Sequence, residues 1–390
     1  MPWTEACAMD QRCAFVEGWL SGEFGMAELC RRFGVSRPTG YKWVERFKHE
    51  GLEGLAEHSR APLAHPNATR PEQVEAIVKA KRRYPHWGPL TLRQWLCRHH
   101  ASSEWPAAST IGEILKRHGL VELCGRCRPR TPPHTEPFAH AREPNDVWSA
   151  DFKGQFVLGD GRACYPLTVT DNASRYVLCC RGMHAPRTRP TMAWLERTFR
   201  EHGLPRALRT DNGAPFASIA LGGLSELSVW LLKLGVMPER IEPGQPQQNG
   251  RHERMHRTLK AATARPPRAS LRAQQRAFDR FLAEFNDERP HRALGGGQRP
   301  GDLYRPSRRP YPSTIPAVEY PTDYTVRKVK PGGYMKWHGQ IIYVTKVLEG
   351  EYVGLKPLDN ERWELYFAHL PLGLFDARAR KIIRPSRTRV

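Results

Sequence analysis

The spacing of hydrophobic residues changes near residue 147 of this chain. Before that point apolar residues recur every three or four positions, as in EQVEAIVKAKRRY, which is typical of amphipathic helices. From Val147 the runs VWSADFKGQFVL, ACYPLTVT and SRYVLCCR alternate or are apolar throughout, and GDGR and TDNAS divide them, which indicates three antiparallel strands. Helices and short strands then alternate. We therefore predict helical domains followed by a mixed α/β domain.

The chain has 390 residues, too many for one domain of ordinary size. We expect a helix-turn-helix domain over 1–62, a second helix-turn-helix or winged-helix-like unit over 66–123, and a Pro/Arg-rich linker over 124–145. An α/β core should follow over 146–306. A small β-barrel over 310–377, with short strands such as YTVRKVK and ERWELYF, and a loose basic tail over 378–390 complete the prediction.

The segment GVSRPTGYKWVERFKHEG has residues at both ends that are typical of the limits of a recognition helix. Gly34 suits the turn, Ser36 the N-cap and Gly51 the end of the helix. Apolar residues at helical spacing should face the core; they are Tyr41, Val44 and Phe47. The side chains left facing outward are candidate DNA contacts: Arg37, Thr39, Lys42 and Arg46. A three-helix bundle with no role in DNA binding is the alternative.

The charge of the chain favours a polyanionic partner. Lys and Arg number 61 against 40 Asp and Glu, giving a formal net charge of +21 and a pI near 9.9. Because phosphate contacts dominate protein–DNA affinity, nucleic acid is the expected partner, with charge for solubility alone as the alternative. The nine cysteines show no disulfide framework, and neither a signal peptide nor a membrane-length apolar run is visible. We expect a cytoplasmic protein with no membrane partner.

Three acidic residues stand where a metal site could form. Asp151 lies in the first strand of the α/β domain, Asp211 ends the strand RALRT, and Glu253 follows the loop QPQQNG on a helix. Three carboxylates held together repel one another, and Mg²⁺, which prefers oxygen ligands, removes that cost. Two such ions ~4 Å apart can activate a water or hydroxyl and stabilise the leaving oxygen of a phosphodiester. Each acid has an ordinary interpretation by itself, as a solvent-facing strand residue, an Asp-Asn-Gly turn or a helix surface charge.

The helix that carries Glu253 also presents cations. At about 100° per residue, Glu253 shares one stripe with Asn249, Arg257 and Lys260, and Arg254 extends this polar surface. Met255, Leu259 and Ala262 form a separate apolar stripe for the core. Glu253 therefore stands among side chains that could hold a phosphate backbone, and Asn249, Arg254, Arg257 and Lys260 are candidate DNA contacts.

The segment HERMH matches the zinc-protease pattern H-E-x-x-H, with His252 and His256 one helical turn apart. Such a protease needs a third protein ligand further along, and the helix instead runs through TLKAATA into ARPPR. The linker contains Cys124, Cys127, His134 and His140, but its Cys-to-His gap is far shorter than that of a zinc finger, and its prolines would splay the ligands. We expect zinc at neither place.

Taken together, WSADFKG, RTDNGAPF and QPQQNGRHERMHRTLK resemble the three blocks of the DDE transposases of bacterial insertion sequences, which share the retroviral integrase core. FNDERPHRAL and RPGDLYRPSRRPYP resemble the end of that core. The resemblance implies an RNase H-like core in which Asp151, Asp211 and Glu253 bind two Mg²⁺, with Mn²⁺ as a substitute. It also implies strand cleavage followed by strand transfer, with N-terminal helices that bind terminal inverted repeats. The gap of 253 − 211 = 42 positions is somewhat longer than is usual in the family.

Two other classes of function were weighed. A domesticated transposase could bind DNA ends as a regulator without cutting, but all three acids are intact. An RNase H-type hydrolase needs no helix-turn-helix units. For a transposase, double-stranded element ends and target DNA are the expected partners. Because an element has two ends and one chain has one acid triad, we expect a homo-oligomer on DNA, associated with the bacterial nucleoid.

Overall fold

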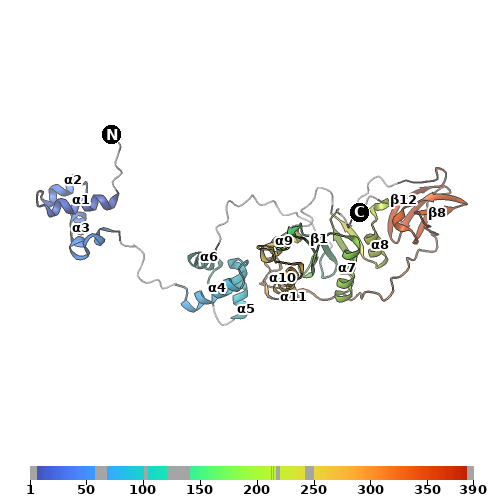
Figure 1. The fold of residues 1–390 in the computed structure, drawn as a ribbon, viewed down its shortest axis with the longest axis horizontal. Helices are drawn as coiled ribbons and strands as arrows, with labels where there is room; N and C mark the ends of the chain where they lie inside the picture. Colours follow the sequence, from blue (N-terminus) through green and yellow to red (C-terminus); the bar gives the residue numbers. More distant parts are fainter. Residues whose placement is uncertain are drawn as a thin grey trace. The chain divides into compact units, whose positions relative to one another are not determined.

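The computed structural model describes residues 7–57, 68–100, 104–121, 141–211, 213, 215–216, 220–241 and 250–383 (Figure 1). Cys124, Cys127, His134, His140 and Asn249 lie outside these residues. The chain divides into two compact units, Met1–Ala68 and Thr69–Val390. Each unit is described by itself below.

The first unit contains three helices, α1 (Ala8–Leu20), α2 (Met26–Arg32) and α3 (Arg37–Glu50), and the 3₁₀ turn η1 (Gly51–Leu55). The predicted boundaries of α3 are confirmed. Gly34 takes φ 66° in the turn, the Ser36 hydroxyl accepts a hydrogen bond from the Thr39 N–H, and Gly51 ends the helix at φ 65°. The core joins Phe15, Leu29, Cys30 and Val44.

The face that α3 turns inward differs from the predicted one. Tyr41 was expected in the core and is 57% exposed, whereas Gly40, Trp43 and Val44 are buried. A Cβ at position 40 would lie 2.6 Å from the Cys30 Sγ, so α3 approaches α2 along its glycine. This close approach rotates the contact face by about one residue from the one that side-chain size predicts.

The second unit begins with another helical group, α4 (Pro71–Arg83), α5 (Pro89–His99) and α6 (Ala108–Arg117). Ile77, Leu92, Leu96 and Ile111 form its fully buried centre. Glu284 and Glu288 on the core hold this group through the indole N–H of Trp87, 2.7 Å from Glu284 Oε1, and through the Tyr84 hydroxyl, which donates to Glu288. Arg98 makes two hydrogen bonds, of 2.9 and 3.0 Å, to the carboxylate of Asp302.

A six-stranded sheet forms the middle of this unit, in the order β2-β3-β1-β5-β6 with β4 beside β3. The strands are β1 (Val147–Phe152), β2 (Phe156–Val157), β3 (Ala163–Asp171), β4 (Val177–Met183), β5 (Ala207–Thr210) and β6 (Met237–Arg240). β3 runs antiparallel to both β1 and β4, while β5 runs parallel to β1 and β6. The predicted mixed α/β core is confirmed, including the three antiparallel strands that open it.

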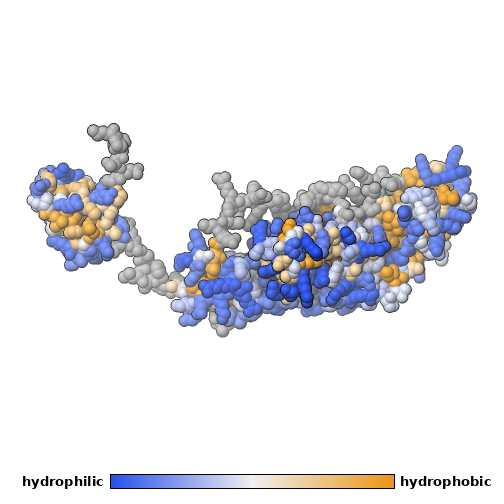
Figure 2. Space-filling view, viewed as in Figure 1, coloured by the Kyte–Doolittle hydropathy of each residue, from blue (hydrophilic) through white to orange (hydrophobic). Residues whose placement is uncertain are grey.

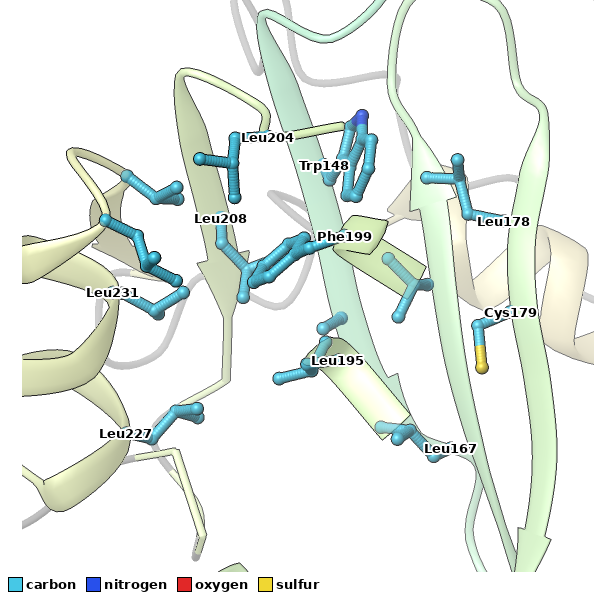
Figure 3. Close-up of a cluster of buried hydrophobic side chains, with 14 of the residues drawn as sticks. Trp148, Leu167, Leu178, Cys179, Leu195, Phe199, Leu204, Leu208, Leu227 and Leu231 are labelled. Carbon is cyan, nitrogen blue, oxygen red and sulfur yellow. The ribbon is translucent and has the colours of Figure 1, made fainter. Parts of the chain in front are cut away.

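One face of the sheet is apolar and is covered by α7 (Thr188–His202) and α8 (Glu226–Lys233). Figure 3 shows Leu195 and Phe199 of α7 against Trp148 and Leu167 of the sheet. The opposite face carries a polar strip, because the alternate residues of β1 and β3 include Ser149, Asp151, Thr168 and Thr170. The helices α9 (Gly250–Thr263) and α10 (Leu271–Ala283) cover that second face.

The edge strand β4 is closed by amide side chains of the chain segment that includes α10. Gln275 accepts a hydrogen bond from the Gly182 N–H and donates one to the Cys180 carbonyl. The buried side chain of Asn286 accepts from the Val177 N–H at 2.8 Å and donates to the Val177 carbonyl at 2.9 Å. Asn286 belongs to a π-helical turn, Glu284–Glu288. These bonds satisfy edge groups that would otherwise be free to pair with another chain.

The C-terminal domain is a five-stranded antiparallel sheet, in the order β13-β12-β11-β10-β7, and a separate two-stranded hairpin, β8-β9. Its strands are β7 (Thr325–Lys328), β8 (Tyr334–Trp337), β9 (Gln340–Tyr343), β10 (Tyr352–Pro357), β11 (Arg362–Phe367), β12 (Leu370–Asp376) and β13 (Lys381–Ile383). Leu232 of α8 contributes to its core, so the domain packs on the α/β sheet layer. The sequence predicts a loose tail from residue 378. That prediction is wrong for Lys381–Ile383, because these residues form β13, which pairs with β12.

Replacing Asn286 with Ala should destabilise the second unit by about 2–4 kcal/mol, because two buried backbone groups of Val177 lose their partners. Gln275→Ala is the matched control at a more exposed part of the same edge, where water can replace the amide, and it should cost about 1 kcal/mol or less. Denaturant unfolding measures both. Equal losses for the two variants would contradict the importance of burial at Asn286.

Candidate active site

Asp151 and Asp211 lie at the same end of neighbouring parallel strands. Ala150 of β1 pairs with Thr210 of β5, and each acid is the next residue along its strand direction. The Gly213 N–H donates to Asp211 Oδ1 at 3.1 Å, and a Cβ at residue 213 would lie 3.1 Å from the same carboxylate. Glycine in the Asp-Asn-Gly turn therefore leaves room for the carboxylate next to Asp151.

Glu253 comes to the same region from α9. Its side chain is exposed, whereas Met255 and Leu259 of the same helix are buried against α10 and the sheet. The predicted apolar stripe is thus present, but it is wider than expected. His252 and His256 belong to it and are 1% and 4% exposed.

The two histidines bind the polar strip of the sheet. Thr168 Oγ1 lies 2.7 Å from Nε2 of His252 and 2.7 Å from Nε2 of His256, and it donates to the main-chain carbonyl of Asp151 at 3.1 Å. Thr170 Oγ1 lies 2.9 Å from the other nitrogen of His252. Since one hydroxyl has one proton, these distances assign an Nε2–H tautomer to both rings, each donating to Thr168. Glu253 is therefore carried on a helix anchored on both sides of it.

Burial explains why both rings are neutral. It lowers the pKa of His252 to about 3. Burial first, and then the neighbouring ring and Lys153, together lower the pKa of His256 to about 2. Among the described residues, Asp151, His252 and His256 are one group whose ligand atoms all lie within 4.8 Å of one another, as in a metal site. Both nitrogens of His252 are already bonded to threonine hydroxyls, so His252 offers no free ligand atom and only two of the three residues remain as possible ligands.

The carboxyl group of Asp151 is strongly perturbed. Burial raises its pKa to about 7, and the negative charges of Asp211 and Glu253 contribute in the same direction, while Lys153 opposes them. The three predicted acids therefore act on one another electrostatically. Carboxylate oxygens gathered in this way are the donors that Mg²⁺ prefers, so the side chains present fit a hard divalent cation.

The predicted DNA contacts differ in how accessible they are. Arg254, Arg257 and Lys260 are exposed on α9, and Arg37 and Lys42 are exposed on α3. Thr39 is half-buried, and its hydroxyl lies 2.8 Å from that of Ser36. Arg46 is half-buried over the Trp43 ring, with Nη1 buried and unbonded. The last two residues are therefore less available for DNA than the sequence predicted.

The sequence interpretation missed the role of the histidines. A usable signal was present, because residues 252, 255, 256, 259 and 263 recur at helical spacing and all five are buried. Histidine is not counted among apolar residues, so the narrower stripe of Met255, Leu259 and Ala262 was predicted instead.

Family models match most of the described fold. The Integrase core domain matches residues 141–246 and, in a second model, 234–297. A Helix-turn-helix domain matches residues 11–62, and a Homeodomain-like domain matches residues 39–115. The fold and these matches define an integrase-core protein with N-terminal helix-turn-helix domains.

Two of the relatives found among known proteins are insertion-element proteins. The IS476 insertion-element protein of Xanthomonas euvesicatoria is 30% identical over 283 residues, which span 72% of this chain and 78% of that protein. The IS407 insertion-element protein of Burkholderia multivorans is 27% identical over 247 residues, or 63% of this chain and 84% of that protein. The chain belongs to the insertion-sequence transposase family of the retroviral integrase core superfamily.

Solved structures similar to this chain include viral integrases. The catalytic core domain of HTLV-2 integrase in complex with magnesium is 16% identical, with a TM-score of 0.34, and the match covers 42% of this chain and 98% of that one. An intasome of simian T-cell lymphotropic virus gives 19% identity and a TM-score of 0.36 over 79% of this chain and 99% of that one. These likenesses are too low to assign residue roles.

Asp151→Asn should stabilise the metal-free protein at neutral pH. The raised pKa means that the folded state binds the Asp151 proton more tightly than the unfolded state, so this group lowers stability as pH rises from about 4 to about 7. At about 1.4 kcal/mol per pKa unit the upper limit is about 4 kcal/mol, and we expect a gain of about 2 kcal/mol at pH 8. Unfolding in EDTA at pH 4 and pH 8 measures it.

The exposed Asp323→Asn is the matched control and should leave stability unchanged at both pH values. A gain for Asp151→Asn that is equal at pH 4 and pH 8, or a loss at pH 8, would contradict the assigned repulsion.

Proposed function

We propose that this protein binds the terminal inverted repeats of an insertion element, cuts the DNA strand there and joins the exposed end to target DNA. The observation that supports this most strongly is the raised pKa of Asp151 beside Asp211 and Glu253. Three acids that repel one another in the metal-free protein are suited to a divalent cation. The family membership supplies the DNA context.

On this proposal, Asp151, Asp211 and Glu253 are the catalytic residues and the ligands of Mg²⁺, or of Mn²⁺ as a substitute. When bound, two such ions supply an activated water or hydroxyl and stabilise the leaving oxygen. The two strand ends and the anchored α9 keep the three carboxylates at one place. Arg254, Arg257 and Lys260, exposed on the same helix as Glu253, contact the DNA backbone.

DNA recognition is proposed for the helical domains. In the first, Arg37 and Lys42 on α3 reach the major groove, with Thr39 and Arg46 as weaker contributors because they are half-buried. Asn249, which lies outside the described residues, remains a proposed contact. The boundaries 1–62, 66–123, 124–145 and 146–306 are proposed for the first four segments. The β domain that begins at 310 extends past the predicted limit of 377 and includes β13, Lys381–Ile383.

The assembly on DNA is proposed to be a homo-oligomer. An element has two ends, each cut needs one acid triad, and one chain has one such triad. At least two chains would therefore meet on a pair of ends. Among the described residues no helix is both long and apolar enough to cross a membrane. The DNA-bound protein would be found with the bacterial nucleoid.

Asp151→Asn, Asp211→Asn and Glu253→Gln should each abolish cleavage of element-end DNA, since each removes a charged oxygen ligand. The affinity for the same DNA in EDTA should stay within about threefold, because these groups position metal rather than the phosphate backbone. A gel assay with labelled ends in Mg²⁺ measures cleavage. Full cleavage by Glu253→Gln would remove Glu253 from the catalytic set.

Lys42→Ala should lower the ratio of affinities for element-end and random DNA at fixed salt by about 5–100-fold, corresponding to about 1–3 kcal/mol for one base contact. Lys48→Ala is the matched control, because Lys48 lies in the last turn of the same helix over the Trp19 ring. Lys48→Ala should lower the affinities for both DNAs by the same factor or leave both unchanged. An unchanged ratio for Lys42→Ala would transfer recognition to α6, where Ser109, Thr110 and Lys116 are exposed.

A further inference from the structure

Arg175 lies in the turn between β3 and β4 with buried guanidinium atoms that have no partner. Within the described part of the chain, its Nε and Nη1 are buried and make no hydrogen bond, and its backbone takes the left-handed φ of 67°. The nearby carboxylate of Asp171 is already used. It accepts from the Asn145 N–H at 2.8 Å, the Ser174 N–H at 2.7 Å and the Ser174 hydroxyl at 2.5 Å.

The first turn of α9 adds positive charge at the same turn. Arg251 Nη1 donates to the Asn172 carbonyl at 3.0 Å, which brings the start of α9 against the β3–β4 turn. Burial first, and then the charges of Arg251 and Arg254, lower the pKa of Arg175 to about 10, while Asp171 opposes them. The N-terminal end of a helix is itself positive.

The segment that follows the π-helical turn is the third element that lies against the β3–β4 turn. The bonds between Asn286 and Val177 hold that segment against the start of β4, two residues after Arg175. His291 follows, with its ring 4.8 Å from that of Phe285 and its Nε2 buried and unbonded. Burial lowers the pKa of His291 to about 4, and the charges of Arg289, Arg175 and Arg254 act in the same direction.

The β3–β4 turn, the start of α9 and the segment with His291 therefore bring together cationic side chains and unbonded nitrogen atoms. The carboxylate of Asp171 in this turn already accepts three hydrogen bonds. A buried cation without a hydrogen-bonded partner is costly, and a planar guanidinium matches the oxygens of a phosphate. We propose that Arg175, Arg254 and His291 form a binding site for one backbone phosphate of DNA. The proposal rests on the proposed function, because it takes the DNA held at Asp151 as the source of the phosphate.

The position of the site suits a role in placing the strand. Thr168 pairs with Asp151, and Asn172 follows four residues later along β3 and its turn, or about 13 Å at the usual rise per residue. A phosphate at Arg175 would therefore belong to the DNA a few nucleotides away from the bond at Asp151. Such a contact fixes the register of the strand on the acids and is independent of base sequence.

The first test uses Arg175→Asn, because asparagine tolerates the left-handed backbone and removes the charge. DNA binding is measured in EDTA at several salt concentrations, so cleavage does not enter. The slope of log affinity against log salt should fall by about 0.9, the value for one phosphate contact. The melting temperature should rise by about 2 °C or more, because an unpaired buried cation is removed. The matched control, Arg200→Ala, removes an arginine paired with Glu196 on α7 and should leave the slope unchanged.

The second test locates the phosphate. Neutral methylphosphonates are placed one at a time along the cleaved strand. One position should weaken wild-type binding and have no effect on Arg175→Asn. In a separate measurement without DNA, inorganic phosphate should raise the melting temperature of the wild type and leave that of Arg175→Asn unchanged.

The outcomes separate this inference from the proposed function. A lower melting temperature with an unchanged slope for Arg175→Asn would make Arg175 a structural residue and overturn the inference. A response to inorganic phosphate without any sensitive position in the DNA would make it a site for free anions only and would also overturn it. Wild-type protein that binds no DNA would contradict the proposed function itself.

Discussion

The hydrogen bonds from His252 and His256 to Thr168 determine where α9 lies, and the candidate active site depends on them. The sheet face beneath α9 is polar, so an apolar helix face alone could not cover it without leaving hydroxyls unbonded. A lysine or arginine at these positions would place a positive charge beside Asp151, and a carboxylate would add to the repulsion. A neutral imidazole donates and accepts without either effect, which explains histidine on both sides of Glu253.

The segment EFNDE, residues 284–288, has a comparable role at the β4 edge of the sheet. Asn286 closes the edge of β4, while Glu284 binds Trp87 and Glu288 binds Tyr84 in the helical group α4–α6. The π-helical turn makes this possible, because it changes the directions of successive side chains relative to a regular helix. One short turn therefore satisfies hydrogen-bonding groups at the β4 edge of the sheet and binds the helical group α4–α6 to the core.

Sequence patterns were sufficient wherever a single physical signal decides the local structure. Alternating residues predicted β1, β3 and β4, and Gly34, Ser36 and Gly51 marked the limits of α3. Sequence patterns did not predict the local structure where a close contact between two elements decides it. Tyr41 was placed in the core because it is large, whereas the close approach at Gly40 turns it to solvent. The short strand Lys381–Ile383 lies among basic residues and has too few apolar positions to be predicted without its partner β12.

The candidate site was predictable only in part for the same reason. The sequence places Asp151 in a strand, Asp211 at the end of another strand and Glu253 on a helix after a loop, where they could converge. The pairing of β1 with β5 that makes the two aspartates neighbours is visible only in the structure. The helical spacing of residues 252, 255, 256, 259 and 263 is a local signal that His252 and His256 are buried. It does not identify their partners, because Thr168 and Thr170 lie more than 80 residues earlier. Arg175 is also inconspicuous in sequence, because its lack of a partner is a property of the packed turn.

Two opposite electrostatic costs lie on either side of α9. Near Asp151 the burial of acids raises a carboxyl pKa, and near Arg175 the burial of cations lowers a guanidinium pKa. The acids and the arginines do not cancel each other, because the β3–β4 turn separates Arg175 from Asp151 along the sheet. On the function proposed here, a divalent cation would relieve the first cost and a DNA phosphate the second. Metal-bound DNA carries both charges in one ligand, so a single binding event would relieve both costs, and α9 would place Glu253 and Arg254 on neighbouring parts of that ligand.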